Sequence, residues 1–185
     1  VMAERENICN QLHLPVQSGS NRILEVMNRR YTVEKYMETI EEAKRKIPGI
    51  TLTTDIIVGF PGETDEDFEL TVKLLHDIKP SLIHMSKYQH RKGAISSSLK
   101  EIPHEVMKKR SKFLSEIKSK ITEEENSELI DSYQNVLVVE KGSKGGFIAK
   151  TDTYIPVVVH DVELGEFIKV HIDQTTGTYL IGHKI

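Results

Sequence analysis

The sequence predicts an α/β protein in which half of a parallel (β/α) barrel is followed by a small OB-like antiparallel β-barrel. Two observations predict the first part: apolar, β-branched runs alternate with helical stripes, and polar or glycine-rich turns follow the runs. The third observation is a change of pattern near residue 128, after which short alternating runs are separated by turn signals. We therefore expect two domains, residues 1–127 and residues 128–185.

Local signals predict the helices and strands of the first domain. Thr64 precedes three acidic residues, and carboxylates in a first turn favour a helix capped by threonine. The β-branched run that ends at Val58 is typical of a buried strand, and Pro80 ends the next helix. The expected elements, in chain order, are a strand over 11–17, a helix from Ser20 or Asn21, a helix after Thr32, a strand over 50–58, a helix after Thr64, a strand over 81–88 and a long helix from Pro103 or His104.

The second domain is expected to consist of short strands. Ile168, Val170 and Ile172 alternate with more polar residues, as in a strand with one buried face. Glycine-containing turns separate the runs, and many short strands at regular spacing favour a small barrel. The expected strands cover residues 134–140, 147–151, 155–160, 167–173 and 177–183.

Polar and glycine residues are expected to meet at one edge of the parallel sheet. Right-handed crossovers place the carboxyl ends of its strands at the same edge, where such folds bind ligands. Gly59 and Gly62 permit positive φ and a close approach of the backbone, and Pro61 stiffens the turn. Asp55 lies in an otherwise apolar run, so its carboxylate needs a salt bridge, a backbone hydrogen bond or a ligand.

The composition narrows the class of protein. The 185 residues carry a formal net charge of −3, so no global basic field indicates nucleic acid. No apolar run reaches the roughly 20 residues of a membrane span, and the single cysteine, Cys9, cannot form a disulfide within the chain. We therefore expect a cytoplasmic protein with no membrane partner. The abrupt opening of the chain also predicts a piece of a longer protein.

Local charge is more informative than net charge. Residues 87–120 hold ten cations and three acids, whereas residues 131–185 hold five cations and seven acids. The basic stretch is either a solvated helix face or a surface for a phosphate backbone. If it binds RNA, the expected contacts are Lys108, Lys109 and Lys112, with Lys141 and Lys144 in a glycine-rich turn of the second domain.

The sequence contains none of the common signatures of a metal or nucleotide site. Its eight histidines show no HExxH or other paired spacing, and neither a cysteine cluster nor a P-loop occurs. We therefore expect no metal-ligating residue in this chain.

Four segments occur in a specific order: HLPVQSGS (13–20), LEVMNRRYT (24–32), TDIIVGFPGETDEDF (54–68) and YQHRKG (88–93). Together they resemble the C-terminal half of a radical SAM methylthiotransferase, and the region after residue 128 resembles the RNA-binding TRAM domain that ends those enzymes. The archaeal and eukaryotic branch is the most similar. That branch methylthiolates threonylcarbamoyladenosine at position 37 of tRNA.

The resemblance implies two cofactors, S-adenosylmethionine and [4Fe–4S] clusters, and two partners, tRNA and the missing N-terminal part of the protein. In the family, a CxxxCxxC loop holds the cluster that cleaves S-adenosylmethionine, and the resulting 5′-deoxyadenosyl radical abstracts hydrogen from C2 of the adenine. This chain lacks those cysteines. It is therefore expected to hold no catalytic residue and to be inactive alone.

The resemblance also implies a site. Arg29 suits the methionine carboxylate, because its guanidinium is a planar fork, and Asp55 suits a ribose hydroxyl or the ammonium group. The implied contacts to S-adenosylmethionine are Gln17, Ser18, Arg29 and Asp55. The implied substrate pocket contains Gly59, Pro61, Gly62, Glu63 and Arg91.

Two other functions remain open on the sequence alone. In one, the protein is a non-catalytic RNA-binding module, whose basic stretch and barrel bind tRNA while the sheet supports them. In the other, it is a phosphate-binding barrel enzyme, and this alternative rests only on the glycine turn at Gly59–Glu63.

Overall fold

A computed structural model describes residues 2–5, 7–90, 93, 95–143 and 145–185 of the chain. It divides into two compact units. The sheet unit comprises residues 13–46 and 52–118, and the barrel unit comprises residues 1–12, 47–51 and 119–185.

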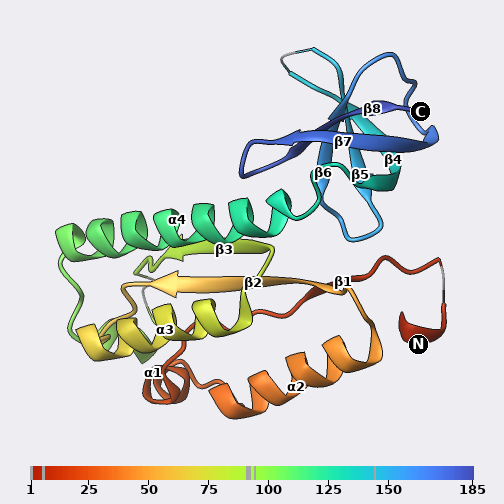
Figure 1. The fold of residues 1–185 in the computed structure, drawn as a ribbon. Coiled ribbons are helices and arrows are strands. Elements are labelled where there is room, and N and C mark those ends of the chain that lie inside the picture. Colours follow the sequence, from red (N-terminus) through yellow and green to blue (C-terminus); the bar gives the residue numbers. More distant parts are fainter. Residues whose placement is uncertain (1, 6, 91–92, 94, 144) are drawn as a thin grey trace. The chain divides into compact units, whose positions relative to one another are not determined.

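A three-stranded sheet with strand order β1-β2-β3 forms the centre of the first half of the chain (Figure 1). Strands β2 and β3 are parallel, and Ile57 of β2 lies opposite Ser86 of β3. The α/β prediction is therefore confirmed. The strands are β1 (Gln11–His13), β2 (Thr51–Val58) and β3 (Leu82–Lys87), and the helices are α1 (Asn21–Val26), α2 (Val33–Lys46), α3 (Asp65–Ile78) and α4 (His104–Ser127), with short 3-10 helices η1 (Met2–Glu4) and η2 (Ile95–Ser98).

The two faces of β2 differ, and this difference positions the site. Leu52, Ile56 and Val58 are buried and belong to the hydrophobic core, as do Leu74 and Leu75 of α3. On the opposite face, Asp55 and Ile57 are only half-buried. Side chains of a strand alternate between its faces, so the face that carries Asp55 and Ile57 is the more accessible one toward the carboxyl end of β2.

The predicted C-terminal boundary of the first strand, residues 11–17, is wrong. Strand β1 stops at His13, because Pro15 has no backbone N–H to donate to a ladder. Pairing resumes at one isolated parallel bridge between Gln17 and Ile56. There the Gln17 N–H donates to the Asp55 carbonyl (2.8 Å), and the Ile57 N–H donates to the Gln17 carbonyl (3.0 Å).

Five strands of the barrel unit close into a barrel with the order β4-β5-β6-β8-β7. Valine and isoleucine fill its interior, including Val136, Val157 and Val170, which are fully or almost fully buried. The closed barrel confirms the OB-like prediction, but the prediction that all strands are antiparallel is wrong. Strand β8 lies between β6 and β7 and pairs with β6 in parallel. The strands are β4 (Tyr133–Lys141), β5 (Phe147–Thr151), β6 (Pro156–Val159), β7 (Phe167–Thr175) and β8 (Leu180–Lys184).

Helix α4 is the longest helix, but it alternates charged and apolar side chains along its length. Among the described residues, no helix has the length and apolar character that crossing a bilayer requires.

Candidate functional site at the carboxyl edge of the sheet

The turn after β2 has the backbone that its sequence predicts. Gly59 and Gly62 both have positive φ, +75° and +82°. Two features exclude a side chain at Gly59. One is its positive φ, and the other is that a Cβ there would lie 2.2 Å from Cγ of Met107. Glycine therefore lets β2 end directly against helix α4.

A buried ion pair between Glu63 and Arg110 fixes this turn. The Glu63 carboxylate accepts a hydrogen bond from the Gly59 N–H (3.1 Å) and one from Nη1 of Arg110 (2.5 Å). The side chains of Glu63 and Arg110 are only 2% and 7% exposed. Burial raises the pKa of Glu63, while the positive charge of Arg110 opposes that rise.

The Arg110 guanidinium joins three partners from the turn and α3. Its Nη2 donates to Asp65 at 2.6 Å, and its carbon lies 5.1 Å above the Phe68 ring. Arg110 is one of the ten cations of the basic stretch, but it is buried and paired, so it adds nothing to a surface for phosphate. The charge of Arg110 is evident from the sequence, but its role in a buried ion pair is evident only from the structure.

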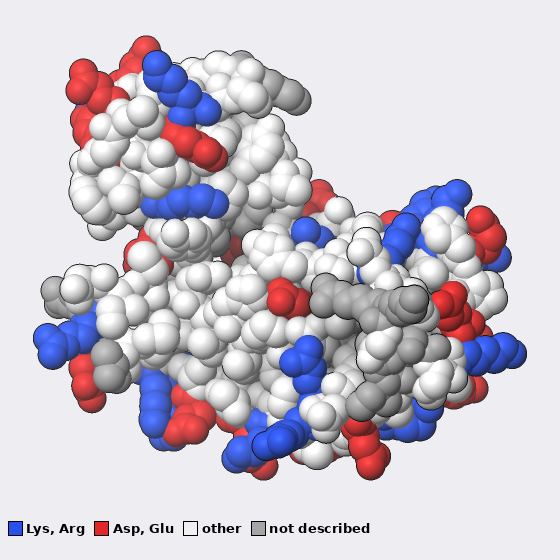
Figure 2. Space-filling view, turned by 180° about the vertical axis from the view of Figure 1, so that it is seen from behind, with Lys and Arg blue, Asp and Glu red and all other residues white. Residues whose placement is uncertain are grey.

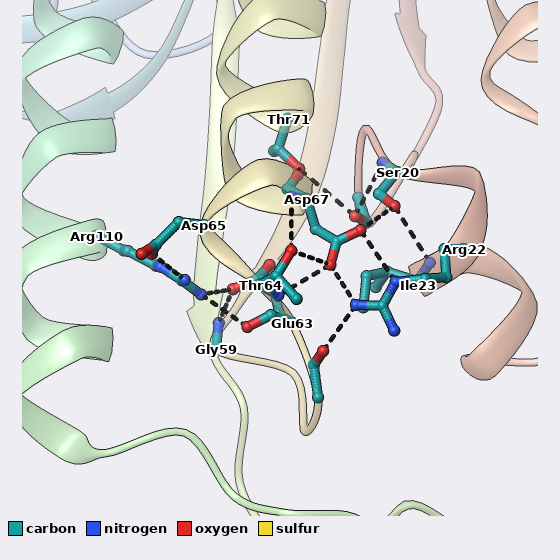
Figure 3. A network of polar contacts seen from close by, with 12 residues as sticks. Ser20, Arg22, Ile23, Gly59, Glu63, Thr64, Asp65, Asp67, Thr71 and Arg110 are labelled. Carbon is teal, nitrogen blue, oxygen red and sulfur yellow. Dashed lines mark hydrogen bonds and ion pairs between the residues drawn. The ribbon is translucent and has the colours of Figure 1, made fainter.

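A second network fixes the start of α3 against α1 (Figure 3). Asp67 accepts hydrogen bonds from the Ser20 hydroxyl (2.6 Å) and the Thr64 N–H (2.9 Å), and it pairs with Arg22. The Thr64 hydroxyl in turn accepts from the Asp67 N–H, which completes a capping box. Burial by itself raises the pKa of Asp67, but the bonds from Arg22, Ser20 and Thr64 together hold that pKa well below its usual range.

The two networks share the turn, because Arg22 also donates to the Gly62 carbonyl (2.7 Å). The carboxylates of Glu63 and Asp67, together with the guanidinium groups of Arg22 on α1 and Arg110 on α4, thus fix the segment from Gly59 to Thr64. A ligand at this edge would meet a turn that is already rigid.

A cavity of about 710 Å³ opens at this edge. Its lining includes Arg29 from the segment after α1, Ile57 and Phe60 from the end of β2, and Tyr88 and Gln89 from the end of β3. Among the described residues, no carboxylate forms an ion pair with Arg29. The volume lies within the range of roughly 300–1,000 Å³ that is usual for small-molecule sites.

Asp55 lies on the same face of the sheet, two residues before Ile57 and so about 6–7 Å along the strand. Its carboxylate is 2.9 Å from Nε2 of His13, and the His13 ring lies 5.7 Å from the ring of His84, which is opposite Asp55 in the sheet. About a third of the Asp55 side chain is exposed. The half-buried carboxylate therefore has a protein partner and remains accessible.

Gln17 and Ser18 occupy different environments. Gln17 has positive φ, +70°, is half-buried and pairs through its backbone with β2, but it is not among the described residues that line the cavity. Ser18 is almost completely buried, and its hydroxyl accepts from the Ser20 N–H (3.2 Å) and lies 3.4 Å from the Thr71 hydroxyl. The Ser18 hydroxyl is thus engaged inside the protein.

The segment before Gln17 is fixed by a buried tyrosine. The Tyr36 hydroxyl donates to the Leu14 carbonyl at 2.8 Å and lies 3.1 Å from the Thr54 hydroxyl. Burial raises the pKa of Tyr36 to about 12, so the phenol keeps its proton at physiological pH. Tyr36 therefore holds residues 14–16 against β2.

The other predicted site residues fall into three groups. Pro61 and Gly62 lie in the turn after β2. Glu63 is buried beside that turn and is not among the described residues that line the cavity. Arg91 and Lys144 lie outside the described residues. The remaining lysines are exposed: Lys108, Lys109 and Lys112 on α4, and Lys141 at the end of β4. Figure 2 shows Lys and Arg interspersed with Asp and Glu over the face in view.

His13, His84 and the aromatic lining of the cavity were not among the predicted site residues. The sequence of β3 holds a signal for His84, because polar His84 and Ser86 alternate with apolar Ile83 and Met85. The predominance of β-branched residues over 50–58 hid the corresponding alternation in β2. The pairing of Asp55 with His84 is visible only once the parallel register is known.

Two segments of the chain match known families. Residues 2–75 match the radical SAM superfamily, and residues 129–185 match the TRAM domain. These two matches confirm the radical SAM and TRAM parts of the resemblance drawn from the sequence.

Curated relatives match nearly the whole chain. A protein of Methanothermobacter thermautotrophicus named probable threonylcarbamoyladenosine tRNA methylthiotransferase is 51% identical over 176 residues, which cover 95% of this chain and 42% of that protein. A protein of Pyrococcus abyssi with the same name is 42% identical over 177 residues, which cover 96% of this chain and 42% of that protein. A tRNA-2-methylthio-N(6)-dimethylallyladenosine synthase of Petrotoga mobilis is 35% identical over 191 residues, which cover all of this chain and 43% of that protein. The chain thus spans less than half the length of these relatives.

Proposed function

We propose that this chain, in which residues 2–75 belong to the radical SAM superfamily and residues 129–185 form a TRAM domain, is part of a tRNA methylthiotransferase. The observation that carries the proposal is the 51% identity to a relative named as such an enzyme. The cavity at the carboxyl edge of the sheet supports it, because that edge is where parallel α/β folds bind their ligands. A cytoplasmic location is part of the same proposal.

The residues of this chain fit S-adenosylmethionine better than they fit a cluster. Arg29 lines the cavity and is available for the methionine carboxylate, and a guanidinium binds a carboxylate through two parallel hydrogen bonds. Asp55 is accessible on the same face for a ribose hydroxyl or an ammonium group. A [4Fe–4S] cluster needs several thiolates, and this chain has only Cys9, which is exposed. Its ligands would have to come from outside this chain.

In this proposal the cofactor supplies radical chemistry, and the described residues bind and position. Arg29 and Asp55 would orient S-adenosylmethionine, and the turn from Gly59 to Gly62 would border the modified adenine. Phe60 and Tyr88 face each other edge to face at 5.3 Å, and both line the cavity. Aromatic rings offer a flat surface for a base that has left its stack.

The proposed substrate is a tRNA adenosine that already carries a modification on N6, with the methylthio group added at C2. Relatives with 51% and 42% identity are named for threonylcarbamoyladenosine, whereas the relative with 35% identity is named for dimethylallyladenosine. We therefore favour threonylcarbamoyladenosine at position 37.

The isolated chain of 185 residues should be inactive. Cleavage of S-adenosylmethionine needs an iron centre that delivers an electron, and one exposed cysteine cannot hold that centre. We expect no 5′-deoxyadenosine when the chain is incubated anaerobically with S-adenosylmethionine, dithionite and tRNA. The longer protein that contains the chain, after reconstitution with iron and sulfide, should produce 5′-deoxyadenosine and a methylthio nucleoside that mass spectrometry detects. Product from the isolated chain above a no-protein control would contradict this expectation.

A non-catalytic RNA-binding module is the second candidate, and the closed barrel favours it because such barrels bind oligonucleotides. The same longer protein separates the two candidates. An amber-brown protein with a cluster absorption supports the enzyme. A protein that stays colourless after reconstitution and still binds tRNA supports the module.

Any RNA affinity of this chain should come more from helix α4 than from the barrel. Lys108, Lys109 and Lys112 are exposed on α4, whereas acids outnumber cations in residues 131–185. Changing the three lysines to glutamate should weaken tRNA binding and flatten its salt dependence, by about one unit of slope per lost phosphate contact. Filter binding at several salt concentrations measures both effects.

The matched comparison is Lys141→Glu with Lys144→Glu in the barrel. This double variant should bind tRNA nearly as well as the unchanged chain. If instead it abolishes binding while the triple variant of α4 binds normally, the barrel is the RNA-binding surface.

A further inference from the structure

Two histidines and one aspartate meet on the outer surface of the barrel. Nδ1 of His171 lies 3.0 Å from one oxygen of Asp173, and Nδ1 of His183 lies 2.8 Å from the other. The two imidazole rings are 5.4 Å apart. His171 is partly shielded, with 23% of its side chain exposed, while Asp173 and His183 are more accessible.

The pairing of two strands brings the two histidines together, although they are far apart in the sequence. His171 of β7 and His183 of β8 lie directly opposite each other in the antiparallel ladder. Gly182 makes the close approach possible, because a Cβ there would lie 2.3 Å from the His171 carbonyl oxygen. A separation of twelve residues matches no metal-binding motif, so the sequence by itself predicts no metal ligand here.

A β-bulge places the carboxylate between the rings. The register of β7 and β8 shifts between Ile172 and Gln174, so Asp173 is the extra residue of the bulge. Bulges bend a strand and re-aim a side chain, and they often occur at functional positions. Since all three residues lie on paired strands of a closed barrel, their backbone positions are fixed without any ligand.

We propose that His171, Asp173 and His183 form a binding site for a divalent transition-metal ion such as Zn²⁺. One ligand atom from each of the three lies within 4.8 Å of the others. Ligands of tetrahedral zinc, at about 2.0–2.1 Å from the metal, lie roughly 3.3 Å apart, so small rotations of the side chains suffice. Two imidazole nitrogens and one carboxylate oxygen are a donor set that zinc accepts, leaving a fourth position for water.

A second carboxylate and an aromatic ring lie close to the proposed site. The Asp131 carboxylate lies 3.9 Å from Nε2 of His171 and adds a second negative charge nearby. The Tyr133 ring packs edge to face against His171 at 5.2 Å, and Nζ of Lys169 lies over the Tyr133 ring, 5.2 Å from its centroid. Imidazole ligands select zinc, copper or nickel over Mg²⁺ and Ca²⁺, which prefer oxygen.

The test is titration of the whole 185-residue chain with Zn²⁺ alone, followed by calorimetry. The chain carries Cys9→Ser, because an exposed thiol would bind zinc independently. We expect one zinc ion per chain, and binding at least tenfold weaker in each of His171→Ala, Asp173→Asn and His183→Ala. Excess Mg²⁺ should not displace the zinc.

His160→Ala is the matched control, because His160 is also an exposed histidine of the barrel unit but lies outside the cluster. It should bind zinc like the Cys9→Ser chain. Asp173→Asn preserves the shape of the side chain, so circular dichroism should show a folded barrel even if an alanine variant unfolds. The proposal is overturned if the Cys9→Ser chain binds no zinc up to millimolar concentration. It is equally overturned if the three cluster variants bind zinc as tightly as the control does.

Discussion

Replacing Arg110 with methionine should lower the free energy of unfolding of the sheet unit by about 3–5 kcal/mol, the usual cost of removing one partner of a buried ion pair. The change would leave the Glu63 carboxylate, whose side chain is 2% exposed, with the Gly59 N–H as its remaining hydrogen-bond donor among the described residues. Desolvation of that unpaired charge is the physical cause of the loss. Urea unfolding monitored by far-ultraviolet circular dichroism measures it.

Two further variants make the result specific. Lys112→Met changes an exposed cation on the same helix and should alter stability by less than about 0.5 kcal/mol. Arg110→Met combined with Glu63→Gln removes both charges and should recover part of the lost stability, because a neutral amide costs less to bury than an unpaired carboxylate. Equal stability of Arg110→Met and Lys112→Met would show that the buried pair does not hold the turn.

In the longer protein that contains this chain, Arg29→Ala and Asp55→Ala should each weaken the binding of S-adenosylmethionine about ten- to a hundredfold. Each variant removes at least one charge-assisted hydrogen bond, and a single such bond contributes roughly 1.5–3 kcal/mol. The fold should persist, because Arg29 is exposed and about a third of the Asp55 side chain is exposed. Anaerobic calorimetry on the reconstituted protein measures the affinity.

Arg45→Ala is the control for Arg29, because Arg45 is an exposed arginine on α2 that lies outside the described lining of the cavity. It should leave the affinity unchanged. Unchanged affinity in Arg29→Ala and Asp55→Ala as well would make both residues structural. The bond from Asp55 to His13 would then be its main role.

Local patterns in the sequence determined most of the elements of this protein. Thr64 and the acids after it predicted the start of α3, and the structure adds only that Asp67 completes the capping box. The alternation of Ile168, Val170 and Ile172 predicted β7 and the barrel core. Glycine at 59 and 62 predicted a turn with positive φ. These features depend on neighbours within about four residues, which the sequence presents directly.

The tertiary structure alone decided which side chains meet. Glu63 and Arg110 are 47 residues apart, Ser20 and Asp67 are also 47 apart, and His13 and Asp55 are 42 apart. Composition counted Arg110 as part of a basic surface, and only its burial against Glu63 showed otherwise. The spacing of His171 and His183 indicated nothing until the register of β7 and β8 placed them opposite each other. Such pairs depend on strand register and helix packing, and those are fixed by the whole core rather than by any local segment.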